Sequence, residues 1–311
     1  MSLHIVIGAG PVGTAAARLL ADRGERVRLL TRRGTGPEHP AIELVAADAT
    51  DAPTLIGHAD GATALYQCAG MPYKNWVTDF PPLAAACVTA AEKTGAVLAT
   101  VGNLYGYGEF DGPVDESHPL QPNSVKGRVR AEMWNSALAA HRAGRIRTVE
   151  VRGSDYLGAG ANSTFTAMAL PALLAGKKAM VPADPDAAHS WTAIDDVACT
   201  LVAAAADDTA WGRPWHVPTP PPMSMRALAE LVASVAGAPP ARVSRMPYAL
   251  LWVAGLFNAD AKEIRELRYQ FDRPFVLDSA AAIAHFGIEP TPTEQAVLAM
   301  VQDRRAGQPK G

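Results

Sequence analysis

The stretch Gly8-Ala9-Gly10-Pro11-Val12-Gly13 follows an aliphatic run at residues 4–7 and opens an alanine-rich segment. A GxGxxG pattern between a strand and a helix is typical of a dinucleotide-binding turn. The first glycine permits the tight turn, the second lets the backbone approach a pyrophosphate, and the third lets the helix pack closely on the strand. The helix N-terminus adds N–H donors and a positive dipole. The pattern predicts a dinucleotide site formed by Gly8, Gly10, Pro11, Val12 and Gly13.

Short aliphatic or β-branched runs alternate with alanine-rich stretches through the first half of the chain, as in a parallel sheet with crossover helices. The predicted strands are residues 4–7, 27–30, 43–45, 62–66, 97–101 and 148–151. The predicted helices are residues 12–22, 54–57, 81–93 and 125–141. Right-handed crossovers would place helices on both faces of the sheet. The sequence therefore predicts an α/β fold, a Rossmann-type doubly wound parallel sheet with a smaller C-terminal substrate-binding lobe.

The regular alternation ends after Arg152, where Pro and Gly become denser. Residues 164–175 form a predicted helix without a strand partner, and a proline-rich connector at residues 217–224 precedes a predicted helix at residues 225–236. We expect residues 1–152, completed by about residues 189–212, to form the dinucleotide-binding lobe. Residues 153–188 and 213–311 would form mainly the substrate-binding lobe.

The composition is that of a globular protein: 311 residues, 49% hydrophobic and 19% charged, with a formal net charge of −3. These values exclude wholesale disorder and give no general attraction to nucleic acid or to acidic membranes. No apolar stretch is long enough to span a bilayer and no signal peptide is recognisable, so we expect a cytoplasmic protein. Cys68, Cys87 and Cys199 are widely spaced, and no cluster has metal-ligand spacing, so we expect neither a disulfide framework nor a metal site.

The end of the second predicted strand distinguishes two cofactors. An NAD-binding unit places Asp or Glu there, to accept hydrogen bonds from the ribose. This chain has Arg32 and Arg33 instead, and a guanidinium group can bind a 2′-phosphate through two parallel hydrogen bonds. The prediction is NADP(H), although the arginines could be solvated loop charges. Further predicted cofactor contacts are Asp48 beside the adenine amino group and Cys68, Ala69 and Gly70 under the adenine ribose.

Together these pieces resemble the extended short-chain dehydrogenase/reductase superfamily, in its NAD(P)-dependent epimerase/dehydratase-like branch. Residues 189–198 (HSWTAIDDVA) resemble the branch's "hVdDva" segment, and residues 223–230 (MSMRALAE) resemble its "lslreLae" segment. Residues 275–287 resemble its closing "D.ska...lG" element. The order of these motifs covers nearly the whole chain. The resemblance implies a nicotinamide-dependent enzyme and a homodimer formed through the helices at residues 81–93 and 125–141.

The catalytic helix departs from this family pattern. The family uses a YxxxK pair, in which the tyrosine transfers a proton and the lysine holds the nicotinamide ribose. Residues 122–132 (PNSVKGRVRAE) align with the family's "PxSPYGxSKAE", which puts Lys126 in the tyrosine position and Arg130 in the lysine position. A second alignment, anchored on Glu132, puts Ser124 and Arg128 there. Neither alignment restores a tyrosine.

The fifth strand departs from the pattern as well. Leu104-Tyr105-Gly106 matches the family's "VYG", which places Val101 in the usual Ser/Thr position, with Thr100 and Asn103 as polar neighbours. Tyr105 is a candidate proton donor because it follows this strand at the carboxyl edge of the sheet, where ligands bind. The residues expected near the nicotinamide are Val101, Lys126, Gly153 and Ser154.

Lys126 and Arg130 are four residues apart and therefore share one face of a helix. A lysine that is buried beside a second cation loses its proton more readily, so Lys126 could act as a general acid or base. Alternatively, the two cations only bind the cofactor, or they form the solvated face of the helix. The candidate catalytic residues are Lys126, Tyr105 and Arg130.

The predicted substrate site combines aromatic walls with a few polar contacts. Besides Tyr105, its residues are Tyr73, Trp76, Tyr156, Phe165, Trp191, Asn162 and Ser163. The sequence thus favours an NADP(H)-dependent oxidoreductase or epimerase/dehydratase-like enzyme that acts on a small carbonyl or hydroxyl substrate. The alternative is a non-catalytic NADP(H)-binding sensor or regulatory protein, which the loss of the usual catalytic residues would explain.

Overall fold

The computed structural model describes residues 1–257 and 265–307. Its centre is a seven-stranded parallel sheet with the strand order β11-β6-β5-β4-β1-β2-β3. The strands are Leu3–Ile7 (β1), Arg26–Thr31 (β2), Ile42–Ala46 (β3), Ala62–Gln67 (β4), Val97–Asn103 (β5), Arg147–Gly153 (β6) and Pro214–His216 (β11). All six predicted strands are present, and none of their ends differs from the prediction by more than two residues. The predicted Rossmann-type α/β fold is confirmed.

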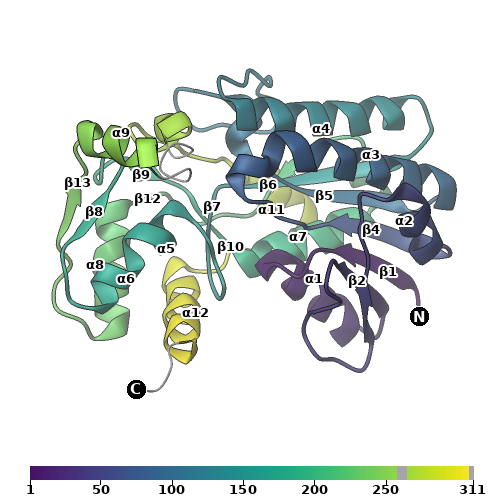
Figure 1. The fold of residues 1–311 in the computed structure, drawn as a ribbon, viewed down its shortest axis with the longest axis horizontal. Coiled ribbons are helices and arrows are strands. Elements are labelled where there is room, and N and C mark those ends of the chain that lie inside the picture. Colours follow the sequence, from purple (N-terminus) through teal and green to yellow (C-terminus); the bar gives the residue numbers. More distant parts are fainter. Residues whose placement is uncertain (258–264, 308–311) are drawn as a thin grey trace.

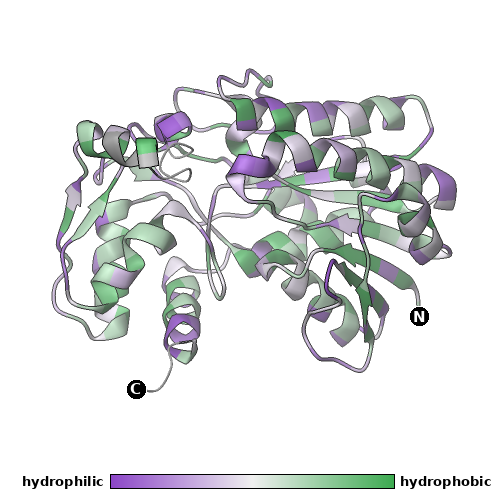
Figure 2. Cartoon of the chain, in the orientation of Figure 1, coloured by the Kyte–Doolittle hydropathy of each residue, from purple (hydrophilic) through white to green (hydrophobic). Residues whose placement is uncertain are grey.

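Helices cover both faces of this sheet (Figure 1). One face packs against Pro11–Asp22 (α1), Ile194–Ala206 (α7) and Ala280–Phe286 (α11). The other face packs against Ala52–Ala59 (α2), Trp76–Thr94 (α3) and Val125–Arg142 (α4). Because both faces are covered, the central strands β1, β4 and β5 carry mostly apolar residues (Figure 2), whereas β2, β3 and β6 also include charged residues.

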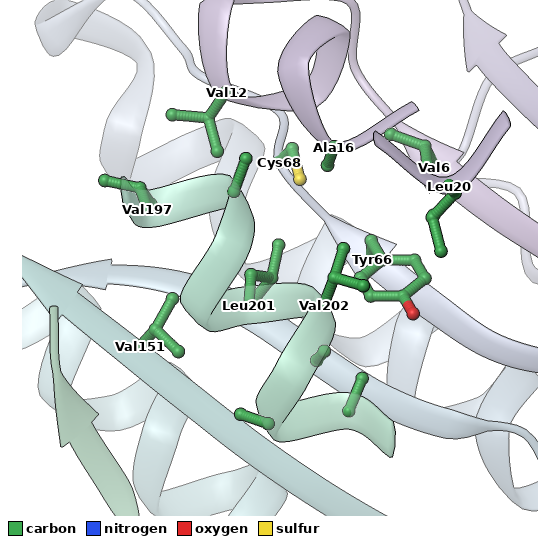
Figure 3. Packing of buried hydrophobic residues seen from close by; sticks show 14 of the residues in the cluster. Val6, Val12, Ala16, Leu20, Tyr66, Cys68, Val151, Val197, Leu201 and Val202 are labelled. Carbon is green, nitrogen blue, oxygen red and sulfur yellow. The ribbon is translucent and has the colours of Figure 1, made fainter. Parts of the chain in front are cut away.

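Successive strand residues belong to opposite hydrophobic cores, because side chains alternate across a pleated sheet. Val6 and Tyr66 pack in the core beneath α1 and α7, whereas Ile5 and Leu65 pack beneath α2 and α3. Figure 3 shows Leu201 and Val202 of α7 close to Tyr66 in the first of these cores. The rigid sheet therefore holds the carboxyl ends of its strands in fixed relative positions.

The direction in which the sheet grows reverses between β1 and β4. The chain adds β2 and β3 on one side of β1 and then returns to place β4, β5 and β6 on the other side. In doubly wound sheets a crevice lies outside the strand ends at such a reversal, and ligands bind there. The segments that follow β1 and β4 therefore face a common crevice.

Residues after β6 form a second set of elements beside the sheet (Figure 1). Three two-stranded pairs occur there: Asp155–Leu157 (β7) with Trp191–Ala193 (β10), Ala188–His189 (β9) with Met223–Ser224 (β12), and Ala179–Val181 (β8) with Val243–Arg245 (β13). The helices are Thr164–Met168 (α5), Leu170–Leu174 (α6), Met225–Ala236 (α8), Tyr248–Phe257 (α9) and Thr293–Ala306 (α12). The lobe boundaries near residues 152, 189 and 212 stay a prediction.

Two helices differ from the prediction. The helix predicted at residues 164–175 is two short helices, α5 and α6, because Pro171 lacks an N–H group and its ring clashes with the preceding turn. Helix α3 begins at Trp76 rather than at residue 81, so Pro81 and Pro82 lie inside it. Trp76 anchors this first turn, since its side chain is buried and its Nε1 donates a hydrogen bond of 2.8 Å to the Met71 carbonyl.

Among the described residues, no helix is both long and apolar enough to cross a membrane. The same residues contain no group of three or more His, Cys, Asp or Glu side chains that could hold a metal ion. Cys68, Cys87 and Cys199 are free thiols.

Candidate functional site

A cleft of about 1530 Å³ runs along the carboxyl ends of β1, β2, β4 and β5. Most of the predicted site residues meet there. The predicted cofactor residues on its wall are Gly8, Gly10, Pro11, Val12, Arg32, Arg33, Asp48, Cys68, Ala69, Gly70, Val101, Gly153 and Ser154. The predicted substrate or catalytic residues on its wall are Tyr73, Trp76, Tyr105, Arg130, Tyr156, Asn162 and Ser163.

The glycine turn between β1 and α1 is shaped by backbone contacts. Gly8 has a φ of +95°, and a Cβ atom there would lie 2.6 Å from Ala69 Cα. A Cβ atom on Gly13 would overlap the Gly8 carbonyl oxygen, so only glycine lets α1 begin this close to β1. By contrast, apart from Gly10 and its chain neighbours, no atom of the described residues lies within 4 Å of a Cβ position on Gly10. No side chain caps the start of α1, so its N–H donors and the open side of Gly10 fit the pyrophosphate of a dinucleotide.

The turn after β2 presents two cations to the cleft. Arg32 and Arg33 are exposed and line it. Thr31 closes this turn, because its hydroxyl accepts a hydrogen bond of 2.9 Å from the Thr35 N–H and donates one of 3.2 Å to the Thr35 carbonyl. Across the cleft edge, hydrogen bonds from the Thr50 N–H and hydroxyl lower the pKa of Asp48, and the charge of Arg32 lowers it further.

Lys126 lies at the start of α4, where it pairs with a residue far along the chain. Its side chain is 3% exposed, and its Nζ lies 2.6 Å from Glu266 Oε2. Glu266 also accepts hydrogen bonds from the backbone N–H groups of Val125 and Lys126. The Lys126 Nζ lies 5.5 Å from the centre of the Tyr73 ring. Lys126 itself is not among the residues that line the cleft.

Arg130 lies one helical turn further along α4 and reaches the cleft wall. Its guanidinium group stacks over the rings of Trp76 and Phe80, at 4.8 Å and 4.3 Å from their centres. Its Nη1 donates a hydrogen bond of 3.1 Å to the Val101 carbonyl, while its Nε is buried without a hydrogen-bond partner. Burial lowers the pKa of Arg130. The position that the sequence alignment matched to the family's lysine therefore carries a cation that lies over two aromatic rings.

Two tyrosine hydroxyls meet on the cleft wall. The hydroxyl oxygens of Tyr73 and Tyr105 lie 2.8 Å apart. Burial raises the pKa of Tyr105 well above its ordinary value, and the neighbouring Tyr73 raises it further. Tyr105 is therefore protonated at neutral pH and can donate a proton to a bound substrate. Burial also raises the pKa of Tyr156, whose hydroxyl lies 3.5 Å from the Gly102 carbonyl oxygen.

Comparison with known proteins identifies the family. The profile of the NAD dependent epimerase/dehydratase family matches residues 4–216. The chain belongs to this family. The resemblance to the extended short-chain dehydrogenase/reductases is thereby confirmed. A search of proteins with curated functions gave no match.

Solved structures share the fold of this epimerase/dehydratase family member. The enzyme WbmH of Bordetella bronchiseptica, in complex with NAD+, is 20% identical with a TM-score of 0.78, and the alignment covers 99% of both chains. The dTDP-glucose 4,6-dehydratase of Bacillus anthracis, in complex with NAD, is 15% identical with a TM-score of 0.80, covering 99% of this chain and 98% of that one. The UDP-glucuronic acid 4-epimerase of Bacillus cereus, also with NAD, is 15% identical with a TM-score of 0.80, covering 98% and 99%.

Four residues predicted for the site of this family member lie elsewhere: Gly13, Lys126, Phe165 and Trp191. Gly13 is buried at the contact between α1 and β1. Trp191 is 2% exposed and packs against Phe165 in a hydrophobic core, and its Nε1 donates a hydrogen bond of 2.8 Å to the Met223 carbonyl. The indole fills this core because β7 and β10 pair there, which the local sequence does not indicate.

Some residues of the cleft were not anticipated as ligand contacts. Asp155 lines it, and its place directly after Gly153 and Ser154, which were predicted near the nicotinamide, was the available signal. Gln270 and Phe275 line it from the C-terminal part of the chain. No local pattern marks these two, because the long-range packing of residues 268–277 carries them to the cleft.

Tyr107, although close in sequence to Tyr105, belongs to a buried polar network behind the cleft. Its hydroxyl accepts a hydrogen bond of 2.7 Å from Arg152 Nη1 and lies 2.8 Å from His216 Nε2. The His216 Nδ1 lies 2.7 Å from the Asp278 carbonyl, which can only accept. His216 is therefore held neutral, with its proton on Nδ1 and with Nε2 accepting from Tyr107. Burial lowers the pKa of His216 to about 4.

Proposed function

We propose that this protein is an NADP(H)-dependent oxidoreductase or epimerase/dehydratase-like enzyme that acts on a small carbonyl or hydroxyl compound. The observation that carries the proposal is a single cleft with an open glycine turn at one end and paired tyrosine hydroxyls at the other. A nicotinamide dinucleotide, when bound, would supply or accept the hydride. The structures of WbmH and of the two Bacillus enzymes contain NAD, which supports a cofactor of this class.

The preference for NADP(H) is supported by the turn after β2. Arg32 and Arg33 lie where an NAD-binding unit carries an acidic residue, and both line the cleft. A 2′-phosphate there would gain charge-assisted hydrogen bonds from the guanidinium groups. The hydrogen bonds between Thr31 and Thr35 hold the turn in the shape that presents these arginines.

Tyr105 is the proton donor that the geometry favours over Lys126. Its hydroxyl lies on the cleft wall against Tyr73, whereas the Lys126 ammonium is buried against Glu266. The raised pKa keeps the Tyr105 phenol protonated, so the hydroxyl is in the form that can protonate the oxygen of a carbonyl undergoing reduction. Arg130 adds a positive charge near the developing negative charge on that oxygen. Lys126 then positions Tyr73 rather than transferring the proton.

The first test is a titration with NADPH and with NADH, followed by nicotinamide fluorescence at fixed salt. We expect NADPH to bind more tightly, and we expect the double variant Arg32→Ala/Arg33→Ala to lose about tenfold or more of that affinity. Arg26→Ala is the matched control, because Arg26 is exposed at the opposite end of β2. Equal affinity for both nucleotides would contradict the NADP(H) assignment, and binding of neither would contradict the enzyme itself.

A second test separates the enzyme from a non-catalytic sensor. We expect NADPH-dependent reduction within a panel of small aldehydes and ketones, and a loss of about 10²–10⁴-fold in Tyr105→Phe. Tyr248→Phe is the control, since Tyr248 is half exposed on α9 and does not line the cleft. Tight NADPH binding without turnover across the panel would favour the sensor.

We also propose a homodimer formed through α3 and α4, as the family resemblance implies. Val77 on α3 and Val125 on α4 are large hydrophobic residues that remain exposed in the single chain, at 56% and 41%. Burying such side chains between two copies would stabilise the pair. Sedimentation equilibrium measures the mass directly, and a monomer at micromolar concentration would contradict the proposal.

A further inference from the structure

We infer that Asp155, held in place by His189, contacts the substrate and selects a hydroxyl or amino group there over a phosphate or carboxylate. The inference deepens the proposed function, because it rests on the substrate binding in the same cleft as the cofactor. The substrate group that contacts Asp155 is expected to be a hydrogen-bond donor that is neutral or positively charged.

Asp155 is brought to the cleft by the path of the chain after the central sheet. It is the first residue of β7, and only Ser154 separates it from the end of β6. It lines the cleft, and 11% of its side chain is exposed. Its Oδ2 lies 2.8 Å from His189 Nε2. The carboxylate is thus largely buried, with one oxygen anchored.

His189 cannot easily move away from Asp155. Its side chain is 3% exposed and stacks against Phe271 and Phe275, with ring centres 5.3 Å and 5.7 Å away and interplanar angles of 17° and 22°. The backbone holds Phe275 beside β9, because its N–H donates to the Ala188 carbonyl at 2.9 Å and its carbonyl accepts from the Ser190 N–H at 3.0 Å. His189 is therefore a positioning residue that fixes the carboxylate before any ligand arrives.

An ionised carboxylate only accepts hydrogen bonds. A substrate hydroxyl or ammonium can donate to it, whereas a phosphate oxygen would meet a like charge in a partly buried setting, where repulsion is poorly screened. The carboxylate of Asp79 also lies on the cleft wall and adds to the negative electrostatic potential there. Aromatic rings from Tyr105 and Phe275 line the same cleft, and such rings favour a cationic group over an anionic one.

Arg130, the cation on the cleft wall beside Tyr105, opposes this selection. Its Nη1 is bonded to the Val101 carbonyl, and its guanidinium plane is stacked against Trp76 and Phe80. It is therefore already oriented toward the end of β5 beside Tyr105, the place where the reacting oxygen would bind. Asp155 reaches the cleft from a separate element, β7, and its negative charge is felt at Tyr105, whose pKa it raises.

The test uses the NADPH-loaded protein and four probes: glucosamine, methyl glucoside, glucuronate and UDP-glucose. Affinities are measured by the change in nicotinamide fluorescence. We expect glucosamine and methyl glucoside to bind more tightly than glucuronate and UDP-glucose. In Asp155→Asn the affinity for glucosamine should fall by about tenfold or more, and the discrimination against the anionic probes should shrink. Asp186→Asn, an exposed carboxylate paired with Arg226, is the control and should change neither.

A pair of variants at His189 tests its positioning role. His189→Gln keeps a hydrogen-bond donor and should retain most of the discrimination, whereas His189→Phe keeps the stacking but frees the carboxylate and should reduce the discrimination. If Asp155→Asn does not fold, the difference in discrimination between His189→Gln and His189→Phe still tests the inference, and equal discrimination in the two variants would contradict it.

Several results would overturn the inference. These are equal or tighter binding of glucuronate or UDP-glucose by the unmodified protein, an unchanged preference in Asp155→Asn, and no binding of any probe to NADPH-loaded protein. Failure of NADPH itself to bind would instead contradict the proposed function, so the two failures are distinguishable.

Discussion

Backbone contacts shape one end of the cleft, whereas contacts between side chains shape the other. At the glycine end, the turn between β1 and α1 depends on backbone contacts among residues that are close in sequence or lie on adjacent strands. At the end beside Tyr73 and Tyr105, the side chains depend on partners far along the chain: the two tyrosine hydroxyls meet across 32 residues, and Lys126 on the neighbouring α4 pairs with Glu266, 140 residues later. A backbone-shaped site demands particular residues at particular positions, so its sequence pattern is recognisable. In a site shaped by side-chain contacts, a residue can be replaced by another when its distant contact partner is replaced as well.

Gly13→Ala should have the largest effect, and it tests the backbone-shaped end. A methyl group there overlaps the Gly8 carbonyl oxygen and comes within 3.1 Å of the Cys68 side chain. Because one of the colliding groups is backbone, α1 must shift from the sheet. We expect the free energy of unfolding, measured by chemical denaturation, to fall by more than about 3 kcal/mol.

Gly10→Ala is the matched control for this variant. Gly10 has a φ of −69°, which alanine adopts readily, and no protein atom would meet the added methyl group. Stability should remain within about 0.5 kcal/mol, since no buried feature is disturbed. NADPH binding should nevertheless weaken, because the methyl group takes space that the pyrophosphate would need. If both variants lost the same stability, the distinction between Gly13, which allows close packing, and Gly10, which leaves room for the cofactor, would be wrong.

Acid should destabilise the buried polar network behind the cleft through His216. Its pKa is about 4 in the folded protein and 6.5 in the absence of burial. Between these values the unfolded chain takes up a proton that the folded protein excludes, so the free energy of unfolding falls as the pH drops from about 6.5 to about 4. The loss should reach about 3 kcal/mol from this residue. Denaturation curves across this pH range measure it, and His216→Gln should flatten that part of the profile. An unchanged profile in the variant would assign the acid sensitivity to other groups.

The smallest effect tests whether Lys126 holds the fold or contacts the cofactor. Lys126→Met removes the ion pair with Glu266, which is largely buried on the lysine side, and should lower stability by about 1–2 kcal/mol. Glu266→Gln keeps acceptors for the N–H groups of Val125 and Lys126 while it removes the charge. Both variants should leave NADPH affinity nearly unchanged. A tenfold loss in Lys126→Met alone would show instead that the lysine reaches the cofactor.

The predictable parts of this protein share a local cause. The six strands and the glycine turn were predicted because apolar runs and close backbone approach impose residue types over a few positions. The start of α3 at Trp76 and the break between α5 and α6 were missed, since burial of Trp76 offset two internal prolines whereas Pro171 interrupted the helix. Where the local sequence favours a secondary structure only weakly, tertiary packing determines which structure forms.

The same division holds within the cleft. The sequence by itself determined the sheet, the position of the glycine turn, and the presence of cations where an acidic residue would mark NAD, because these follow from sterics and charge over short stretches. Only the tertiary structure decided that Lys126 pairs with Glu266, that Tyr105 meets Tyr73, and that Asp155 meets His189. Each of these pairs joins residues at least 30 positions apart, and side chains so separated are brought together only when the hydrophobic cores on the two faces of the sheet and beside it have formed.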